Sequence, residues 1–391
     1  MDLGLDRITR VLDRLDRPQD KVPVIHLAGT NGKGSTVAYL GQMLRRGGRR
    51  VGQFTSPHFL EPRDAIRVDG VPVDSGRYEV LQAQVDAVKG GKELTSFERE
   101  TVVAFLHFLE EGVEVAVVEC GLGGELDATN VCSRPLLCIL TAVSLDHQGH
   151  LGSTIPEIAR VKVGIMRPGV PMLLAPQEDE RVEGVVRGRA KDLGCPVHLV
   201  QDQEMDSPLG GRAQGRNVAT ALAALSLLPA TLVEEDGGRI GEWLEGIRWP
   251  GRMDRQRLEP LRDPVLLDGA HNPAGARALR EVVDEEGMGQ PIGWILGMSE
   301  GKDVEGVLRE LLRPGDQVMT LGFSTPEGMP WCRCVDPQRL AQQVKAEREG
   351  LVRQAMMEAS KTVSTHRPVV CGSLYLLADV YRAFDLRAFP S

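Results

Sequence analysis

The chain has 391 residues and a formal net charge of −9, because its 55 Asp and Glu residues outnumber its 46 Lys and Arg residues. This acidic balance argues against a nucleic-acid-binding protein, whose affinity depends on cations that neutralise phosphates. Hydrophobic residues make up 42% of the chain, which excludes global disorder, and no apolar run approaches the roughly 18 residues of a membrane span.

The first predicted elements are a helix, a strand and a glycine-rich loop. Leucine and isoleucine recur at helical spacing between Leu3 and Leu15, among charged residues, which predicts a helix. Residues 22–29 form a short apolar run that stops at a glycine, a pattern typical of a buried parallel strand. The loop 29–36 comes next, followed by a helix that closes at Gly47 and Gly48 and by a second strand over 51–57.

The same alternation continues along the chain. Helices are predicted over 97–109, 156–166 and 217–230, a strand with a glycine loop over 113–124, and a strand over 136–147. A second strand–loop–helix series begins at 264–273 and continues through 292–299, 315–323 and 367–384. This order predicts an α/β fold, with a P-loop, ATPase-like parallel-sheet domain over 1–260 and a smaller Rossmann-like domain over 261–391.

The cysteines carry a prediction about the compartment. Seven cysteines are spread along the chain, and the first twenty residues are charged throughout rather than signal-like. We therefore expect free thiols in a cytoplasmic protein. Cys332 and Cys334 have no second Cys or His pair at zinc-site spacing, which argues against a metal site there.

The loop GTNGKGS at 29–35 carries residue types that bind nucleotide phosphates. Its glycines allow backbone N–H groups to approach phosphate oxygens, and the N-terminus of the following helix attracts anions. Lys33 can reach the β- and γ-phosphates, and the Ser35 hydroxyl can ligate Mg²⁺. The loop is two residues shorter than the general pattern G-x-x-x-x-G-K-[ST], and the alternative interpretation is an ordinary glycine-rich turn.

Two further candidate residues end predicted strands. Glu119 closes the apolar run before the loop 121–124, and His147 closes the run over 136–147. Because ligands bind at the carboxyl ends of parallel strands in such sheets, we expect both residues near the phosphate loop. Together with Ser35 they would give Mg²⁺ oxygen and nitrogen ligands; the alternatives are a solvated or helix-capping carboxylate and an ordinary loop histidine.

The segment HLAGTNGKGST resembles the folylpolyglutamate synthase/dihydrofolate synthase family of the Mur ligase superfamily. Six later segments resemble family motifs in the family's order: TSPH (55–58), GLGGELDATN (121–130), SLDH (144–147), PGR (250–252), LDGAHNP (267–273) and GSLYL (372–376). Since these motifs extend from residue 26 to residue 376, the resemblance covers nearly the whole chain.

The resemblance implies an ATP-dependent, ADP-forming amide ligase. In such an enzyme ATP converts a carboxylate to an acyl phosphate, and the amine of L-glutamate then displaces the phosphate. The acceptor would be a folate, as in folylpolyglutamate synthase, and also dihydropteroate, as in dihydrofolate synthase. The resemblance further implies ATP and Mg²⁺ as cofactors, small-molecule substrates and a monomer. Composition and charge predict a cytoplasmic protein with neither nucleic acid nor membrane as partner.

The resemblance also implies roles for individual residues. Lys33, Lys162, His147 and Arg252 would be catalytic, and Lys162, as a carbamate, would join Ser35, Glu119 and His147 as a metal ligand. ATP would be bound by Gly29, Thr30, Asn31, Gly32, Lys33, Gly34, Ser35, Thr36, Asn217, Arg252, Asp268 and His271. The acceptor would be bound by Thr55, Ser56, Pro57, His58, Asp127 and Asn130.

Several positions depart from the family's pattern. Asp64 and Ala65 stand where Glu and Arg are expected, Glu125 stands where Arg is expected, and Lys162 lies in V-K-V-G instead of E-K-A-G. Because these departures lie outside the phosphate loop, they leave open a Mur-type ligase for a different carboxylate, or polyglutamylation without dihydrofolate synthesis. A P-loop switch or assembly protein is disfavoured, because it would need a full-length loop and a strand that ends in Asp.

Overall fold

The computed structural model describes residues 4–203, 205–233, 240–258, 264–287, 290–347 and 367–390. The chain divides into two compact units: the first comprises Met1–Pro208, Ala213–Ile247 and Phe389–Ser391, and the second comprises Leu209–Arg212 and Arg248–Ala388. The domain boundary predicted at residue 260 falls on 259–263, which lie outside the described residues. The chain passes into the second unit between Ile247 and Arg248.

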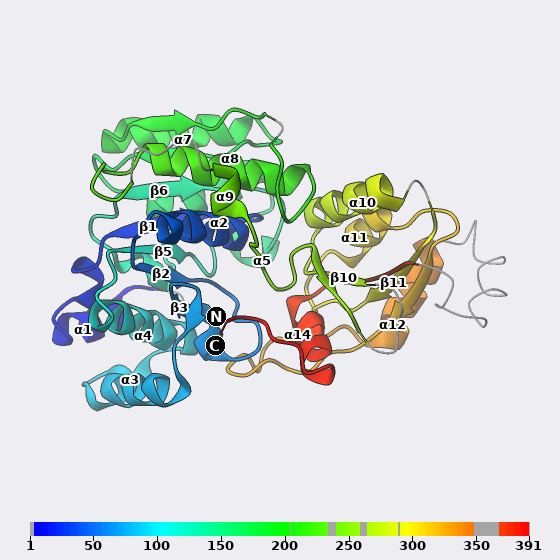
Figure 1. Cartoon of the computed structure of the whole chain (residues 1–391), viewed down its shortest axis with the longest axis horizontal. Helices are drawn as coiled ribbons and strands as arrows, with labels where there is room; N and C mark the ends of the chain where they lie inside the picture. The colour runs from blue at the N-terminus through cyan, green and yellow to red at the C-terminus, as the bar shows by residue number, and fades with distance from the viewer. Residues whose placement is uncertain are drawn as a thin grey trace. The chain divides into compact units, whose positions relative to one another are not determined.

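The first unit is built on a sheet with the strand order β4-β3-β2-β5-β1-β6-β7-β8 (Figure 1). Its strands are β1 (Val24–Ala28), β2 (Val51–Phe54), β3 (Ile66–Val68), β4 (Val71–Pro72), β5 (Val115–Glu119), β6 (Leu137–Leu140), β7 (Met172–Leu174) and β8 (Val197–Leu199). Neighbouring strands from β2 to β8 pair in parallel, and β3 and β4 add an antiparallel hairpin at one edge. β1 and β5 are buried at every residue, as central strands of a parallel sheet are.

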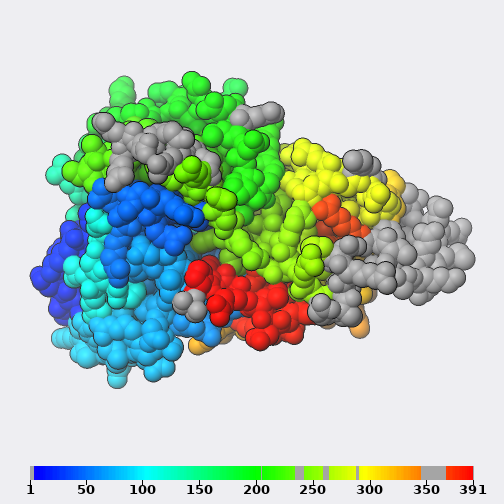
Figure 2. All heavy atoms as spheres, in the orientation of Figure 1, coloured from blue at the N-terminus to red at the C-terminus, as the bar shows by residue number. Residues whose placement is uncertain are grey.

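The helices of this unit cover the sheet. They are α1 (Asp6–Arg14), α2 (Lys33–Arg46), α3 (Ser75–Ala87), α4 (Ser96–Glu110), α5 (Gln148–Leu151), α6 (Ile155–Lys162), α7 (Arg181–Leu193), α8 (Arg212–Ser226) and α9 (Ile240–Leu244), with 3₁₀ turns η1 (Pro18–Asp20), η2 (Pro62–Ala65), η3 (Gly91–Glu93), η4 (Ala128–Val131) and η5 (Val163–Ile165). α4 and α6 both begin with a capping box, which satisfies N–H groups at their N-termini. One hydrophobic cluster joins α1, α3 and α4 to β2 and β5, and another joins α6 and α7 to β6 and β7. α3, light blue in Figure 2, forms part of the surface of the unit.

The second unit has a smaller sheet with the strand order β12-β11-β13-β10-β9. Its elements are β9 (Asp254–Gln256), β10 (Val265–Asp268), α10 (Pro273–Gly287), β11 (Ile292–Leu296), α11 (Val304–Leu311), β12 (Gln317–Thr320), α12 (Pro337–Glu347), β13 (Arg367–Cys371) and α14 (Leu374–Ala383). All neighbouring strands are parallel except β9, which pairs antiparallel with β10. The aliphatic core lies between β10, β11, β13 and the neighbouring helices α10 and α11, which lie side by side (Figure 1).

The predicted α/β fold is confirmed, because both units carry largely parallel sheets with helices between successive strands. The hairpin β3–β4 and the helices α3, α7, α11 and α12 are additional to the predicted elements. All seven cysteines are thiols rather than disulfides, as expected. Within the described ranges, every helix is too short or too polar to cross a membrane.

Candidate functional site

The phosphate loop joins β1 to α2. Gly32 occupies the helix N-cap with φ of 87°, and α2 begins at Lys33, so Lys33, Gly34, Ser35 and Thr36 form its first turn. The first N–H groups of a helix have no intrahelical acceptor and point out of its N-terminus. The strand–loop–helix context required for a phosphate-binding loop is therefore present.

The first residues of this loop are fixed to the segment after β6. The N–H groups of Thr30 and Asn31 donate to the Ala142 carbonyl at 2.8 and 3.2 Å. The Thr30 hydroxyl bonds the backbone of Ser144, and the Asn31 amide donates to the Ser144 hydroxyl at 3.0 Å. These contacts give Thr30 and Asn31 a role in shaping the loop, whereas their predicted contact with ATP stays a prediction.

Gly29 and Gly32 lie where a side chain has no room. A Cβ on Gly29 would lie 1.8 Å from the Thr141 hydroxyl, and a Cβ on Gly32 would lie 2.3 Å from the Asn217 amide oxygen. Both glycines also have positive φ, 155° and 87°. The close approach of Asn217 to Gly32 shows that the N-terminal part of α8 packs against the phosphate loop, within the first unit.

We expect Gly29→Ala to disrupt this loop, because the added Cβ would lie 1.8 Å from the hydroxyl and 3.3 Å from the backbone carbonyl carbon of Thr141, which is 1% exposed. Overpacking of this kind typically costs about 1–3 kcal/mol. Thermal unfolding and ADP binding measured by calorimetry should show a lower Tm and a large loss of affinity. Gly184→Ala in α7 is the matched control, since its Cβ would meet nothing within 4 Å and should not lower the Tm. An unchanged ADP affinity in Gly29→Ala would contradict the predicted close approach.

Lys33 and Glu119, predicted separately, lie together in the structure. The Lys33 Nζ atom is 3.5 Å from a carboxylate oxygen of Glu119 at the end of β5, and both side chains are largely buried. Lys33 Nζ also donates to the carbonyls of Gly29 and Thr30, at 3.2 and 3.4 Å. The Lys33 side chain is thus folded onto its own loop and balanced by a carboxylate, and its predicted contact with phosphate stays a prediction.

Lys162, in the last turn of α6, points at the same loop. Its Nζ donates to the Gly29 carbonyl at 2.7 Å, and the side chain is 4% exposed. Burial, and to a lesser extent the nearby Lys33, lowers the pKa of Lys162 from 10.5 to about 7. A substantial fraction of this amine is therefore uncharged and nucleophilic near neutral pH.

His147 and Asp146 lie in the loop after β6. His147 has a left-handed backbone with φ of 50°, and its Nε2 atom lies 3.9 Å from the Asp146 carboxylate. The His147 side chain is 44% exposed, whereas Asp146 is 9% exposed and contributes negative potential at Lys162. Asp146 was not among the predicted site residues, although it precedes His147 in the same SLDH motif.

Ser35 is held by α8. The Ser35 hydroxyl accepts a hydrogen bond from the Gln214 side chain at 3.2 Å, and Asn217 donates to the Gln214 amide oxygen at 3.1 Å. Gln214, which is buried and was also not predicted, has its amide oriented by these contacts and by Tyr39. Its only sequence signal is its position one helical turn before Asn217.

The donor set fits a magnesium ion. In the part of the chain that the structure describes, no three His, Cys, Asp or Glu residues form a metal cluster. Mg²⁺ that accompanies a nucleotide usually uses one or two carboxylates together with phosphate oxygens and water. Glu119 at the phosphate loop supplies such a carboxylate, and Ser35 supplies a hydroxyl oxygen.

The predicted acceptor-binding motif TSPH follows β2. Thr55 and His58 are buried, Ser56 and Pro57 are half-buried, and the Ser56–Pro57 peptide bond is cis. The buried guanidinium of Arg67 donates to the Thr55 hydroxyl at 2.9 Å, which makes Arg67 a further residue of this region that was not predicted. The strand β3 has three residues, which is too short for an alternation of apolar and polar residues to single out Arg67 in the sequence.

The departures Asp64 and Ala65 are internal to the protein. The Asp64 carboxylate accepts from the N–H groups of Leu60 and Glu61, both at 3.0 Å, and caps the turn η2. Burial raises the pKa of Asp64. The Ala65 side chain is 1% exposed, and its carbonyl accepts from Thr55 N–H at 3.0 Å. Both residues shape the TSPH region through the backbone.

The side chains of Asp127 and Asn130, which are predicted to bind the acceptor, are turned into their own loop. The Asp127 carboxylate accepts from Leu122 N–H at 2.7 Å and from the backbone and hydroxyl of Thr129. The Asn130 amide donates to the Glu125 and Gly164 carbonyls and accepts from Arg167. Both side chains are buried and fix the loop through these bonds, whereas their predicted contact with the acceptor stays a prediction.

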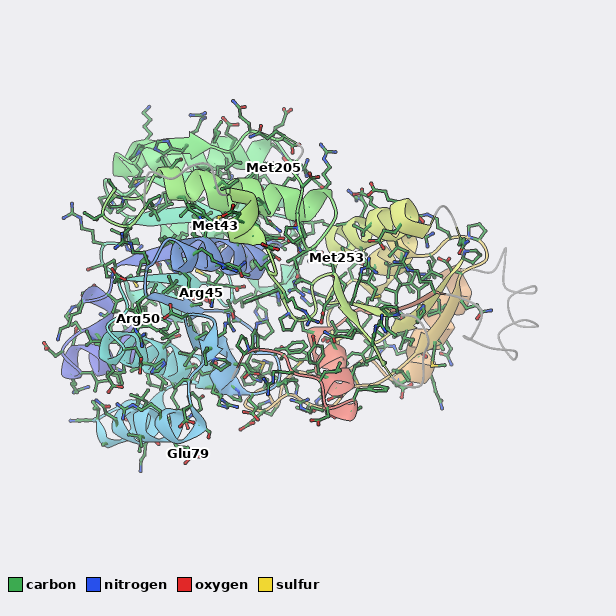
Figure 3. The ribbon with its side chains drawn as sticks, viewed as in Figure 1. Met43, Arg45, Arg50, Glu79, Met205 and Met253 are labelled. Carbon is green, nitrogen blue, oxygen red and sulfur yellow. The ribbon has the colours of Figure 1, made fainter. Side chains whose placement is uncertain are left out.

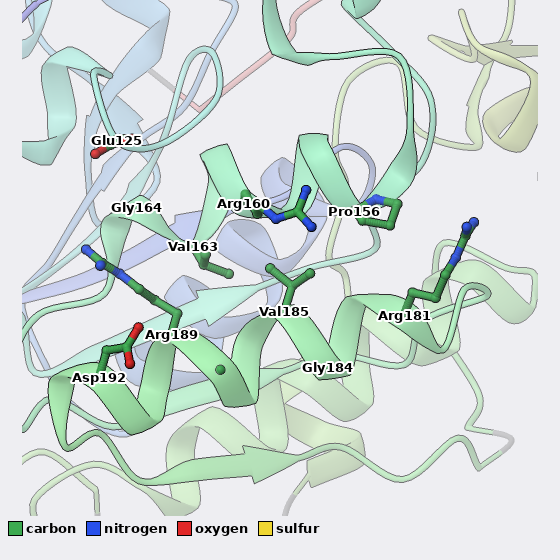
Figure 4. Close-up of a pocket in the computed structure, with 11 residues that line it drawn as sticks. Glu125, Pro156, Arg160, Val163, Gly164, Arg181, Gly184, Val185, Arg189 and Asp192 are labelled. Atoms are coloured by element: carbon green, nitrogen blue, oxygen red, sulfur yellow. The ribbon is translucent and has the colours of Figure 1, made fainter.

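Glu125 borders the groove of about 780 Å³ in Figure 4, between α6 and α7. Valines and glycines line it together with Arg160, Arg181, Arg189 and Asp192. Of the predicted site residues, none lines this groove, and of the noted departures Glu125 and Val163 do. The charge reversal at Glu125 therefore lies on an open surface and not at the phosphate loop.

The second unit brings three motifs together at Gly269. A Cβ there would lie 2.3 Å from the Arg252 guanidinium and 2.6 Å from Leu374, so the PGR, LDGAHNP and GSLYL segments converge. Asp268 accepts from the N–H groups of Met253 and Ala270, both at 2.9 Å, and burial raises its pKa although Arg252 acts in the opposite direction. His271 contacts the Gly269 carbonyl through Nδ1 at 2.8 Å.

Comparison with known proteins gives a consistent result over the whole chain. Residues 252–383 match the family model described as the C-terminal domain of dihydrofolate synthetase. The chain is 34% identical to the dihydrofolate synthetase of Saccharomyces cerevisiae, over 98% of each protein.

Solved structures agree with this match. The chain superposes on a Mycobacterium tuberculosis folylpolyglutamate synthase complexed with ADP and AMPPCP with a TM-score of 0.84, at 27% identity over 98% of this chain and 96% of that one. A bifunctional folylpolyglutamate synthase/dihydrofolate synthase from Yersinia pestis, complexed with AMPPNP and a Mn ion, gives 0.80 at 28% identity over 99% and 94%.

Proposed function

The chain belongs to the dihydrofolate synthetase and folylpolyglutamate synthase family, and from this premise we infer that it is an ATP-dependent, ADP-forming ligase that adds L-glutamate to a pterin-bearing carboxylic acid. The observation that supports this most directly is the match over 98% of a dihydrofolate synthetase, together with a phosphate loop in its expected setting. The reaction needs a phosphoryl transfer to a carboxylate, followed by attack of an amine on the acyl phosphate.

The first unit would position the phosphoryl transfer. Lys33 is proposed to leave Glu119 and bind the β- and γ-phosphates, where its charge stabilises the transferring group. The N–H groups of Lys33, Gly34 and Ser35 would bind phosphate oxygens at the N-terminus of α2. Asn217, which lies beside Gly32, would contact the nucleotide from α8.

ATP and a divalent metal are the cofactors of this reaction. Mg²⁺ would be held by Glu119, with Ser35 and His147 as further proposed ligands, and it supplies charge neutralisation at the phosphates. The His147 side chain is 44% exposed and lies next to Asp146 in the loop after β6.

The second unit would contribute Arg252, Asp268 and His271. The planar guanidinium of Arg252 can bind two oxygens of a phosphate or acyl phosphate. Asp268, at the end of β10, occupies the position from which a carboxylate commonly accepts from ribose hydroxyls. Its two hydrogen bonds from backbone N–H groups fix the direction in which it points.

We propose that Lys162 becomes carbamylated: its neutral amine attacks CO₂, a C–N bond forms and a proton is released. The buried amine beside Gly29 and Lys33 is suited to this, because a carbamate would turn a repelling cation into a carboxylate that can bind a metal.

Enzyme depleted of CO₂ should therefore regain activity when bicarbonate is added. Since deprotonation of Lys162 proceeds as pH rises through about 7, the gain should be larger at pH 8 than at pH 6. The measurement is the ratio of rates with and without bicarbonate at each pH. Lys162→Met should show no such gain; a gain of equal size in this variant would assign the effect to another group.

For the acceptor we propose dihydropteroate, with extension of folates as a second activity of the same site. The match with a dihydrofolate synthetase over 98% of both chains supports the first, and the likeness to a bifunctional enzyme supports the second. Asp64 and Ala65 are buried next to the TSPH motif. They are positions of the predicted acceptor region where this chain departs from the family's residues.

A substrate panel tests the proposal. Purified enzyme is given ATP and L-glutamate with dihydropteroate, with a reduced monoglutamyl folate, or with neither, and products are read by mass. ADP formation and a product heavier by one glutamyl residue with dihydropteroate is the expected result. Extension of the folate alone would leave polyglutamylation as the sole activity. ADP release that needs neither acceptor nor glutamate would contradict the ligase assignment.

A further inference from the structure

The turn that carries Arg252 has a strained backbone. Gly251 and Met253, on either side of Arg252, both have positive φ, 68° and 47°. Met253, labelled in Figure 3, is not a glycine, so this backbone conformation costs about 1 kcal/mol or more. Such a conformation persists only where the surrounding structure imposes it. The turn is therefore held in place by its contacts within the second unit.

One set of contacts comes from the loop after β10. Met253 N–H donates to the Asp268 carboxylate at 2.9 Å, and Gly269 N–H donates to the Gly251 carbonyl at 2.8 Å. The Arg252 side chain also donates to the Gly251 carbonyl, at 3.0 Å. These bonds tie the turn to the loop that carries Asp268 and His271.

The turn is also held by a buried polar cluster of Asp254, Gln256 and Tyr381, which has no part in the reaction described above. Asp254, at the start of β9, is 7% exposed and accepts from the Tyr381 hydroxyl and, at 2.8 Å, from the Gln256 amide. Gln256 also donates to the Tyr381 oxygen at 3.0 Å. Asp254 lies two residues after Arg252 and approaches Gly251 N–H at 3.5 Å.

Tyr381 connects this cluster to α14. It is 2% exposed, and burial together with Asp254 raises its pKa, so the hydroxyl remains a donor across the physiological range. Leu374, the first residue of the same helix, packs at Gly269 beside the Arg252 guanidinium. Residues near both ends of α14, Leu374 and Tyr381, thus contact the segment that contains Arg252.

We propose that Asp254 and Tyr381 are positioning residues: their hydrogen bond fixes the 249–254 turn so that Arg252 is presented in one orientation before a phosphate arrives. The inference rests on the proposed role of Arg252. A rigid, preorganised guanidinium binds a developing charge without reorganising, and a displacement of about 1 Å can cost up to 10²-fold in rate. A purely stabilising role would affect folding but not the rate constant.

Tyr381→Phe in the full-length enzyme removes this hydrogen bond and keeps the ring. We expect kcat to fall about tenfold, with a modest loss in Tm. Thr320→Val is the matched control, because it also removes one hydroxyl hydrogen bond in the same unit, the 2.9 Å bond to the Pro337 carbonyl, on the strand at the opposite edge of the sheet from β9. The control should lower the Tm comparably and leave kcat unchanged; equal losses of kcat in both variants would overturn the proposal.

A double-mutant cycle with Arg252→Ala separates the two roles, with single-turnover ADP formation as the readout for slow variants. If Tyr381 acts through Arg252, then Tyr381→Phe causes no further loss of rate in the Arg252→Ala background. The same fold-loss in both backgrounds would overturn the positioning role while leaving the function of Arg252 intact. If Arg252→Ala itself keeps the wild-type rate, the assumed role of Arg252 fails, and the positioning role fails with it.

Discussion

Lys33→Ala is expected to reduce the rate of ADP formation about 10³-fold, with folding preserved. The side chain contacts carbonyls of its own loop and Glu119, so its removal leaves the backbone of the loop in place. The loss arises in the transition state, where Lys33 is the cationic side chain of the first unit that is proposed to contact the transferring phosphoryl group. The measurement is single-turnover ADP formation alongside thermal unfolding.

Lys21→Ala is the control for this variant. Lys21 lies just before β1, whereas Lys33 lies just after it, and Lys21 forms an exposed ion pair with Asp16. Its removal should change the rate by less than about twofold, since exposed pairs contribute about 1 kcal/mol at most to stability. Near-wild-type turnover in Lys33→Ala would end the assignment of 29–35 as the phosphate site.

Glu119→Gln is expected to raise the Mg²⁺ concentration needed for half-maximal activity at least about tenfold, which corresponds to about 1.4 kcal/mol of binding free energy. The amide keeps the size of the side chain but removes the charge that attracts the metal. It also removes the partner of Lys33, whose ion pair with Glu119 is largely shielded from water. A Mg²⁺ titration of activity measures the metal requirement. Mn²⁺ binding in the presence of ADP measures the affinity for the metal directly.

The same strand supplies the control for Glu119. Glu114 precedes β5, at the opposite end from Glu119, and its exposed carboxylate pairs with Arg49 and accepts from Arg50 N–H. Glu114→Gln should leave the Mg²⁺ requirement unchanged. If both variants titrate like the wild type, Glu119 is not a metal ligand.

The sequence predicts the arrangement around the phosphate loop well, for a geometric reason. Glu119, the loop after Ala28 and the segment containing His147 all follow the carboxyl ends of strands, and the sheet order β5-β1-β6 places those ends next to one another. Apolar runs that stop at a glycine are enough to identify the strands in the sequence, whereas the order of the strands in the sheet is known only from the structure. Lys162 meets the loop because α6 packs beside it, which only the family resemblance indicated.

Some polar side chains that the sequence predicts at the acceptor site form hydrogen bonds within the protein. Asp127 and Asn130 lie in a motif rich in hydrogen-bonding side chains, and nothing in the residue pattern tells a substrate contact from a bond to the protein's own backbone. Arg67 and Gln214 were missed for the opposite reason: each lies in an ordinary strand or helix, and its partner is distant in sequence. Long-range side-chain pairs of this kind require the tertiary structure.

The hairpin β3–β4 has a consequence for association of the chain with copies of itself. β4 is two residues long and ends the larger sheet at Pro72, which has no N–H group to offer a neighbouring strand. An open sheet edge is a template for strand addition and aggregation, and short strands with proline are one means by which proteins prevent it. The β4 edge of the larger sheet is therefore closed to the addition of another strand. This protects the folding chain while its long-range parallel strand pairs are still forming.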